Sequence, residues 1–389
     1  MVNLKDWQEI NIGNDTTLKA RIGWQGLTTS EYKDSGEYYL VTGTDFENGL
    51  VNWDTCHFVD KWRFDQDKNI QLKVNDVLIT KDGTIGKAGF IDTIKLPTTL
   101  NSGVFVIRTN SNKLDQKYLY YIFTSEIFVE FLNRLTAGST INHLYQKDFI
   151  HFTFKAPNIE EQKAIAKALS DTDELINSLE KLISKKEAIK QGSMQQILTG
   201  KKRLSGFTGE WEEKKLADIC EIKKGEQLNK QYLNYTDPFP VINGGIEPSG
   251  YTNKYNSEPN TITISEGGNS CGFVNFISTN FWLGGHCYSI NNFNLEITFF
   301  YQLLKNFENK IMGLRLGSGL PNIQKKALLD FRINIPKKID EQQAIAQILS
   351  DMDKEIESLK SKLSKTKAIK DGIMSELLTG KTRLKVKDE

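Results

Sequence analysis

A stretch of 46 residues occurs twice in this chain. The first copy begins at Ile159 and reads IEEQKAIAKALSDTDELINSLEKLISKKEAIKQGSMQQILTGKKRL; the second begins at Ile339 and reads IDEQQAIAQILSDMDKEIESLKSKLSKTKAIKDGIMSELLTGKTRL. Aligned without a gap, 26 of the 46 positions are identical, and the offset of 180 residues is close to half of the 389-residue chain. An internal repeat dictates the order of the elements around it. The sequence therefore predicts a tandem in which a globular segment and a long helix occur twice.

The apolar residues of the repeat predict what the helices pack against. They recur at spacings of three and four and leave the opposite face polar, which is typical of a heptad-like stripe that needs a helical partner. The stripe consists of Leu169, Ile176, Leu179 and Ile183 in the first copy and Leu349, Met352, Ile356, Leu359 and Leu363 in the second. The simplest solution is an antiparallel coiled coil of the two helices, with the globular units at opposite ends and related by a pseudo-two-fold axis. The alternative is that each helix packs on its own domain.

The ends of the helices also carry signals. Asn158 followed by Glu161 has the spacing of a capping box, and Gly200 and Gly380 stand where a helix C-cap glycine is favoured. Ser170 and Asp173 repeat the capping-box spacing inside the first copy. This second signal predicts a short helix that ends near Ser170 before a longer one begins.

The globular segments read as α+β units. In the first segment, short β-rich runs at residues 38–42, 77–80, 89–94 and 104–108 precede a helical run at 114–135. The second segment repeats this order more loosely. We interpret its glycine-rich loop, and the equivalent loop of the first segment, as hairpin turns between strands, because neither opens a helix in the spacing that a phosphate-binding loop needs.

Composition narrows the class of protein. The net charge is only +1, so bulk electrostatics do not favour a chain that grips nucleic acid alone. The four cysteines are spread widely and form no C-x-x-C pair, which argues against a disulfide scaffold and against a structural zinc site. We expect no bound metal, no membrane span and no secretory signal, and a cytoplasmic protein.

No catalytic constellation is evident. The motif H-E-x-x-H does not occur. Gly268-Asn269-Ser270-Cys271-Gly272 matches G-x-S-x-G, but it lies in a loop that we interpret as a hairpin turn and not at the strand-to-helix turn that a nucleophilic serine needs. Glu221-Ile222-Lys223 resembles the E-x-K of some nucleases, but the carboxylate expected upstream is not evident. A stand-alone DNA endonuclease and a coiled-coil scaffold without DNA therefore stay open as alternatives to a binding subunit.

The duplicated motif carries a family resemblance. The pattern P-x-I-E-E-Q-x-A-I-A, continued by L-S-D and closed by L-T-G-K-x-R-L, resembles the helical regions of type I restriction–modification specificity subunits. PVINGGIEPSGYTNKYN followed by ITISEGGNSCGFVNF resembles one of their target recognition domains, and RIGWQGLTTSEY with LITKDGTIGKAGF resembles another. The resemblance covers essentially the whole chain.

The resemblance implies an architecture and a function. It implies recognition domains at residues 1–157 and 205–337 and helical spacers at 158–204 and 338–389. Such subunits have no catalysis of their own, and each recognition domain reads one half of a split sequence in double-stranded DNA. The helices set the gap and dock two methyltransferase subunits, which restriction (translocase–nuclease) subunits can join. This chain is expected to bind no cofactor, and S-adenosylmethionine, ATP and magnesium belong to the partner subunits.

Base reading needs hydrogen-bonding side chains near groove edges. On that ground we expect DNA contacts from polar residues in the predicted loops of both recognition domains. The candidates are Lys81, Asp82, Thr84, Lys87, Arg134, Ser139, Thr140 and Asn142 in the first domain, and Lys223, Lys224, Gln227, Asn243, Ser265, Glu266, Asn269, Arg315, Ser318 and Asn322 in the second.

Overall fold

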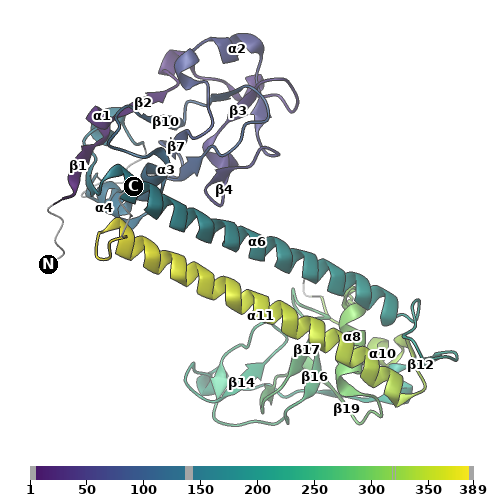
Figure 1. Ribbon diagram of the computed structural model, residues 1–389. Coiled ribbons are helices and arrows are strands. Elements are labelled where there is room, and N and C mark those ends of the chain that lie inside the picture. Colours follow the sequence, from purple (N-terminus) through teal and green to yellow (C-terminus); the bar gives the residue numbers. More distant parts are fainter. Residues whose placement is uncertain (1–5, 136–142, 318, 320, 385–389) are drawn as a thin grey trace. The chain divides into compact units, whose positions relative to one another are not determined.

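The computed structural model describes residues 6–135, 143–317, 319 and 321–384 (Figure 1). The chain divides into two compact units, the first built from Met1–Ser178 with Leu363–Glu389 and the second from Leu179–Lys362. The two repeat copies form the long helices α6 (Ile159–Ile197) and α11 (Ile339–Leu378). Each long helix contributes one part to each unit. The predicted tandem of globular segment and helix is confirmed, whereas the predicted domain boundaries, drawn from sequence pattern, stay predictions.

The first unit is built on a six-stranded sheet with the order β2-β10-β7-β8-β5-β4. Its strands are β2 (Thr16–Ala20), β10 (Val104–Thr109), β7 (Val77–Thr80), β8 (Ala88–Phe90), β5 (Leu50–Val51) and β4 (Phe46–Glu47). Smaller sheets are formed by β6 (His57–Phe58), β3 (Tyr39–Val41) and β9 (Thr98–Leu100), and by β1 (Gln8–Asn11) with β11 (Thr153–Ala156). The helices of its globular part are α1 (Ile12–Asp15), α2 (Lys61–Asp65), α3 (Gln116–Phe123), α4 (Glu126–Leu135) and α5 (Gln146–Phe149).

The second unit repeats this plan with fewer strands. A four-stranded sheet has the order β13-β19-β16-β17, formed by Glu221–Lys224, Cys287–Asn291, Thr261–Ser265 and Val274–Ile277. A smaller sheet joins β15 (Tyr251–Thr252), β14 (Phe239–Ile242) and β18 (Trp282–Leu283), and β12 (Glu212–Lys215) pairs with β20 (Arg332–Ile335). The helices of its globular part are α7 (Leu216–Ile219), α8 (Ile297–Asn306), α9 (Glu308–Met312) and α10 (Lys325–Leu329).

The local predictions agree with these elements. The β-rich runs of the first segment overlap β3, β7, β8 and β10. Both glycine-rich loops connect antiparallel neighbours, β7 with β8 and β16 with β17. The helical run at 114–135 forms two helices. Helix α3 ends at Phe123, and α4 begins at Glu126 after Thr124 and Ser125, where the Ser125 carbonyl accepts from the backbone N–H groups of Phe128 and Val129. Tyr118, Ile122 and Phe128 of that run are buried, and Leu132 is half-buried.

Ion pairs within each unit establish that the long helices run antiparallel. In the second unit, Lys190 of α6 contacts Asp353 of α11 at 2.5 Å, and Glu187 of α6 contacts Lys360 of α11 at 2.7 Å. A lower residue number in α6 is therefore paired with a higher number in α11, as in antiparallel helices. In the first unit, Asp173 of α6 contacts Lys370 of α11 at 2.6 Å, which is the same pair shifted by one repeat. The predicted antiparallel coiled coil, and with it the α+β fold class with an internal repeat, is confirmed.

The residues of the predicted stripe are buried or partly buried, and Leu169 and Leu349 belong to the apolar cores of the first and second units. Six of its members are at most 9% exposed, and three are partly buried. The six are Leu169, Ile176, Leu179, Ile183, Leu349 and Ile356; the three are Met352, Leu359 and Leu363. Burial of this apolar stripe supplies the tertiary packing from which a long amphipathic helix gains most of its stability.

The predicted break near Ser170 is wrong, because α6 is one helix from Ile159 to Ile197. The polar side chains that suggested a cap have other partners. The Ser170 hydroxyl accepts a hydrogen bond from Lys117 Nζ at 2.7 Å, and the Asp173 carboxylate accepts one from the Tyr121 hydroxyl at 2.9 Å. With these side chains held by α3, no local cap competes with the helix.

The true helix ends follow the sequence signals. The Asn158 side chain accepts a hydrogen bond from the backbone N–H of Glu161 at 2.9 Å, as an N-cap does. Gly200 and Gly380 adopt left-handed φ angles of 70° and 72°, which suits a glycine after the last helical turn. The Glu161 side chain does not complete the capping box, however; it forms an ion pair with an arginine from the end of the other repeat.

That ion pair occurs once in each unit. In the first unit, the Arg383 guanidinium donates from Nε to Glu161 Oε1 at 2.8 Å and from a terminal nitrogen to Oε2 at 2.7 Å. In the second unit, Arg203 does the same to Glu341 at 2.6 and 2.7 Å. The two glutamate side chains are only 3% and 4% exposed. We call these two pairs the clasp, because each fixes the start of one long helix to the segment that follows the other.

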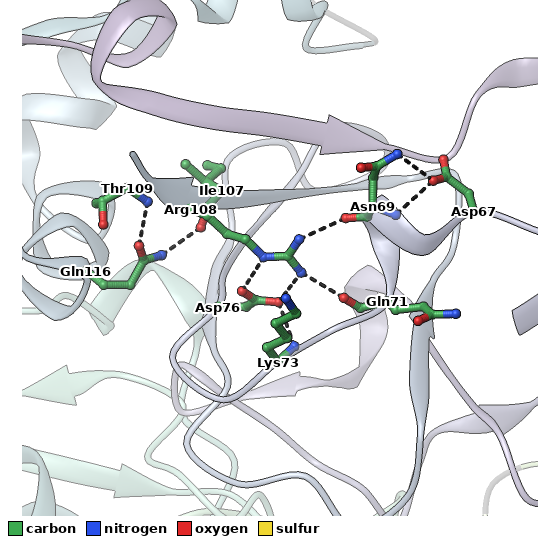
Figure 2. Close-up of polar contacts among 9 residues, drawn as sticks. All are labelled: Asp67, Asn69, Gln71, Lys73, Asp76, Ile107, Arg108, Thr109 and Gln116. Atoms are coloured by element: carbon green, nitrogen blue, oxygen red, sulfur yellow. Dashed lines mark hydrogen bonds and ion pairs between the residues drawn. The ribbon is translucent and has the colours of Figure 1, made fainter. Parts of the chain in front are cut away.

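A second arginine network braces the sheet of the first unit (Figure 2). Arg108 on β10 donates to both carboxylate oxygens of Asp76, at 2.7 and 2.6 Å, and to the backbone carbonyls of Asn69 and Gln71. Asp76 directly precedes β7 and its side chain is 5% exposed. The network therefore fixes the start of β7, the strand that leads into the predicted DNA-contacting loop.

The clasp predicts a specific loss of stability. Arg203→Met roughly keeps the length of the side chain but leaves the buried Glu341 carboxylate without its charged partner, with the 3.3 Å hydrogen bond from Trp211 Nε1 remaining. We expect the free energy of unfolding to fall by roughly 3 kcal/mol. Denaturant unfolding followed by tryptophan fluorescence measures this, since Arg203 lies 5.7 Å from the Trp211 ring centre. The matched control is Arg332→Met, whose pair with Glu213 is 57% exposed on both sides and should cost less than about 1 kcal/mol. Equal, small losses in the two variants would contradict a stabilising clasp.

Candidate nucleic-acid interface

A hollow on the second unit collects several of the predicted site residues. It has a volume of about 640 Å³ and lies where strand ends meet: Lys224 ends β13, Asn243 follows β14, and Glu266 follows β16. Its lining consists of Lys224, Asn243, Gly244, Gly245, Glu266, Gly267, Gly268, Ser270, His286, Pro321 and Asn322. The structure thus brings together Lys224, Asn243, Glu266 and Asn322, which the sequence places far apart.

Glu266 is the most tightly held side chain of this hollow. Its Oε1 accepts hydrogen bonds from Lys224 Nζ at 2.6 Å and from the Tyr288 hydroxyl at 2.9 Å, and its side chain is 15% exposed. Burial, and next the hydrogen bond to Glu266, raise the pKa of Tyr288 well above its usual value. Tyr288 therefore stays protonated and remains a donor that orients the carboxylate.

Glycines and hydroxyls shape the wall of the hollow. Gly244 has a φ of +87°, and a Cβ there would lie 2.6 Å from the His286 carbonyl oxygen, so only glycine fits. The hydroxyls of Ser265 and Ser270 each donate to the Gly244 carbonyl at 2.6 Å. Ser265 is only 2% exposed, which gives it a role in holding the wall; the prediction that it contacts DNA has no further support in this geometry.

The remaining candidates of the second unit lie outside this lining. Lys223 is exposed on β13 and contacts Glu221 at 3.4 Å. Gln227 lines a neighbouring hollow that also includes Asn243. Asn269 and Arg315 are exposed, and Ser318 lies outside the described residues. Sequence reasoning missed His286 and Ser270; the adjacent Gly284 and Gly285 were the available signal for His286, because paired glycines permit a close approach of the backbone.

In the first unit, four candidates lie on the turn between β7 and β8. Lys81 is half-buried, its ammonium is 5.3 Å from the Phe105 ring centre, and burial lowers its pKa. Asp82 contacts His143, and Lys87 donates to the Phe46 carbonyl at 2.6 Å. The fourth, Thr84, is exposed at the turn.

The other candidates of this unit lie elsewhere. Arg134 is exposed near the end of α4. Ser139, Thr140 and Asn142 lie outside the described residues. The structure therefore gathers half of the first-domain candidates on one hairpin.

The described residues show no candidate metal centre. Among them, no group of three or more His, Cys, Asp and Glu side chains is placed to hold a metal ion. All four cysteines are free thiols in this structure. Within the same residues, no helix is both long and apolar enough to cross a membrane.

The fold and the site together define a duplicated α+β recognition chain, in which each globular part is followed by a long helix that pairs with its counterpart. The family model of the type I restriction modification DNA specificity domain matches residues 5–191 and 208–367. The chain belongs to this family. The prediction of a specificity subunit is confirmed at this level.

Individual relatives agree. A putative type I specificity subunit of Mycoplasma pneumoniae, S.MpnORF638P, is 34% identical over 172 residues, which are 43% of this chain and 46% of that protein. The chain thus spans about half the length of this relative. The MjaVIII specificity subunit of Methanocaldococcus jannaschii is 25% identical over 421 aligned residues that cover 98% of this chain and 94% of that one.

A solved structure shares the fold. The crystal structure of a type I restriction–modification S subunit from M. genitalium has a TM-score of 0.66, with 22% identity, and covers 97% of this chain and 96% of that one. At this identity the likeness concerns the fold alone.

The support of Glu266 leads to a prediction for Tyr288→Phe. This variant removes the hydroxyl that donates to the carboxylate and leaves the ring in place, so we expect unfolding free energy to fall by about 1.5–3 kcal/mol, as for a hydrogen bond to a charged group. Thermal or denaturant unfolding measures the loss. Tyr235→Phe is the control, because Tyr235 is 89% exposed and its loss should stay within about 0.5 kcal/mol. A Tyr288→Phe chain as stable as the control would show that the hydroxyl does not hold Glu266.

Proposed function

We propose that this chain is the DNA-recognition subunit of a type I restriction–modification complex, in which each globular part reads one half of a bipartite target. The observation that carries the proposal is the duplication itself: two similar but unequal domains, each attached to one of two paired helices. Two unequal readers match a target whose halves differ in sequence.

The chemistry of the candidate interface supports base reading more than phosphate binding. The hollow of the second unit presents amide, carboxylate, hydroxyl and backbone groups, which are the donors and acceptors that read base edges in the major groove. The net charge of +1 leaves little cation excess for the phosphates. Partner subunits then supply much of the phosphate contact.

The long helices supply a surface for those partners. Besides the buried seam, α6 carries Leu175, Leu182 and Ile189 at intervals of seven residues, and these side chains are 43%, 38% and 46% exposed. Exposed apolar side chains at heptad spacing suit a further helix. We assign this face to the docking of two methyltransferase subunits, to which restriction subunits can be added.

Catalysis in this proposal belongs to the partners. S-adenosylmethionine, ATP and magnesium act in the methyltransferase and restriction subunits, and this chain supplies the sequence specificity. The complex works in the cytoplasm, where bacterial and archaeal DNA lies.

In this proposal the helix pair acts as a ruler: its length sets the gap between the two half-sites in the DNA. A change in helix length tests this role. Seven residues of heptad pattern inserted both after Ser178 and after Lys362 keep the apolar stripes in register and lengthen the helix pair by roughly 10 Å, about three base pairs of DNA. We expect methylome mapping of cells that co-express the chain with its methyltransferase to show one bipartite motif, and the variant to show the same half-sites with a longer gap.

Two controls sharpen this experiment. Replacing seven residues at the same points without changing the length should leave the gap unchanged. Changed half-site sequences with an unchanged gap would refute the ruler, and the absence of any bipartite motif in the unaltered chain would refute the proposed function.

A further inference from the structure

The β7–β8 hairpin of the first unit presents one residue in a defined backbone setting. Lys81 follows β7 directly. Its backbone N–H donates to the Gly103 carbonyl at 2.9 Å, and its own carbonyl accepts from the Leu144 N–H at 2.8 Å. Both bonds tie the residue to segments distant in sequence, so the position of Lys81 is fixed by the fold.

Glu266 has the same setting in the second unit. It follows β16 directly, its N–H donates to the His286 carbonyl at 2.9 Å, and its carbonyl accepts from the Ile323 N–H at 2.8 Å. The hairpin bonds agree as well, since the preceding residue of each strand, Thr80 or Ser265, accepts from a glycine N–H at 2.9 Å. Lys81 and Glu266 are therefore structural equivalents in the two domains.

The two equivalents have opposite chemistry. An ammonium group offers three donors and no acceptor, whereas an ionised carboxylate only accepts. Lys81 Nζ lies 5.3 Å from the Phe105 ring centre, and no hydrogen-bond acceptor from the described part of the chain reaches it, although the Asp82 carboxylate is near enough to act on it electrostatically. Both donors to Glu266 use Oε1, and no donor among the described residues reaches Oε2. Each position thus has hydrogen-bonding capacity left for a ligand.

The ligand of the second position is not a phosphate. A carboxylate repels a phosphate, and the glycine-rich wall around Glu266 leaves room for a planar group to approach. In the major groove, a carboxylate accepts from the exocyclic amine of cytosine, and adenine also presents such an amine. A lysine in the equivalent place donates to the O6 and N7 acceptors of guanine.

We propose, building on the function proposed above, that Lys81 and Glu266 are the same specificity position in the two recognition domains with inverted preference. Lys81 selects guanine in one half-site, and Glu266 selects an amine-bearing base, cytosine or adenine, in the other. Tyr288 and Lys224 are positioning residues that orient Glu266. The same backbone position in the two domains then reads two different bases, because the side chain that it carries differs in charge.

Two variants test the proposal by methylome mapping in cells that co-express the methyltransferase. Lys81→Met removes the ammonium donors, and Glu266→Met removes both carboxylate acceptors from a side chain of similar length. Each should make one position of one half-site degenerate and leave the other half-site and the gap unchanged. Lys19→Met and Glu258→Met, at exposed positions outside the two hairpin loops, are the controls and should leave the motif intact.

The outcomes separate the inference from the proposed function. If the unaltered chain gives a bipartite motif and either variant keeps it, or weakens methylation of all sites equally, the inference is wrong while the proposed function stands. A uniform loss would identify a phosphate contact. If the unaltered chain gives no bipartite motif, both fail.

A measurement on the unaltered complex covers the case in which a variant does not fold. Target duplexes carry, at one position at a time in the half-site of the second domain, a base analogue without the exocyclic amine. Binding to one of these duplexes should weaken roughly 5- to 150-fold, the range of a good base contact. Equal binding to all of them would overturn the assignment of Glu266.

Discussion

The clasp between Glu161 and Arg383, and its counterpart between Glu341 and Arg203, is the constraint on which the rest of the structure depends. A nearly buried carboxylate is costly unless it is paired. Within one repeat copy, the glutamate and the arginine stand at opposite ends of a continuous long helix and cannot reach each other. Only the other copy, running antiparallel, supplies the missing partner, and so two copies in one chain satisfy both glutamates.

The repeated aspartates connect the helices to the globular parts. The Asp173 carboxylate accepts a hydrogen bond from the Tyr121 hydroxyl of α3 and forms an ion pair with Lys370 of α11. The Asp353 carboxylate likewise accepts a hydrogen bond from the Gln302 amide of α8 and forms an ion pair with Lys190 of α6. In each unit, one carboxylate therefore joins three elements. The globular part is oriented on its own helix pair by this bond as well as by apolar packing, which by itself is not directional.

The parts of the fold that periodicity and capping govern could be predicted from the sequence. The burial of the apolar stripe, the caps at Asn158 and the two glycines, and the hairpins all follow from local pattern. The break near Ser170 failed because a capping signal is local, whereas the partners of Ser170 and Asp173 come from α3 and α11. The clasp was hidden for the same reason.

The candidate site was predictable only in part. Polar residues in glycine-rich loops pointed to Lys224, Asn243, Glu266 and Asn322, but their convergence depends on which strand ends adjoin in the sheet. Ser265 has the composition of a site residue, yet its hydroxyl is turned to the Gly244 carbonyl. Composition cannot distinguish a hydroxyl that supports a wall from one that faces a ligand.

There is a physical reason why the two halves of the chain share the residues of the clasp and the aspartate bonds but differ at Lys81 and Glu266. Residues of the clasp and the aspartate bonds must match a partner from the other copy, so a change in one needs a compensating change elsewhere in the chain. Lys81 and Glu266 are held through their backbones, by bonds that any residue other than proline can make. The backbone positions of these two residues therefore do not depend on the charge of the side chain. A duplicated chain built in this way keeps one architecture while its two halves acquire different chemistry at the same position.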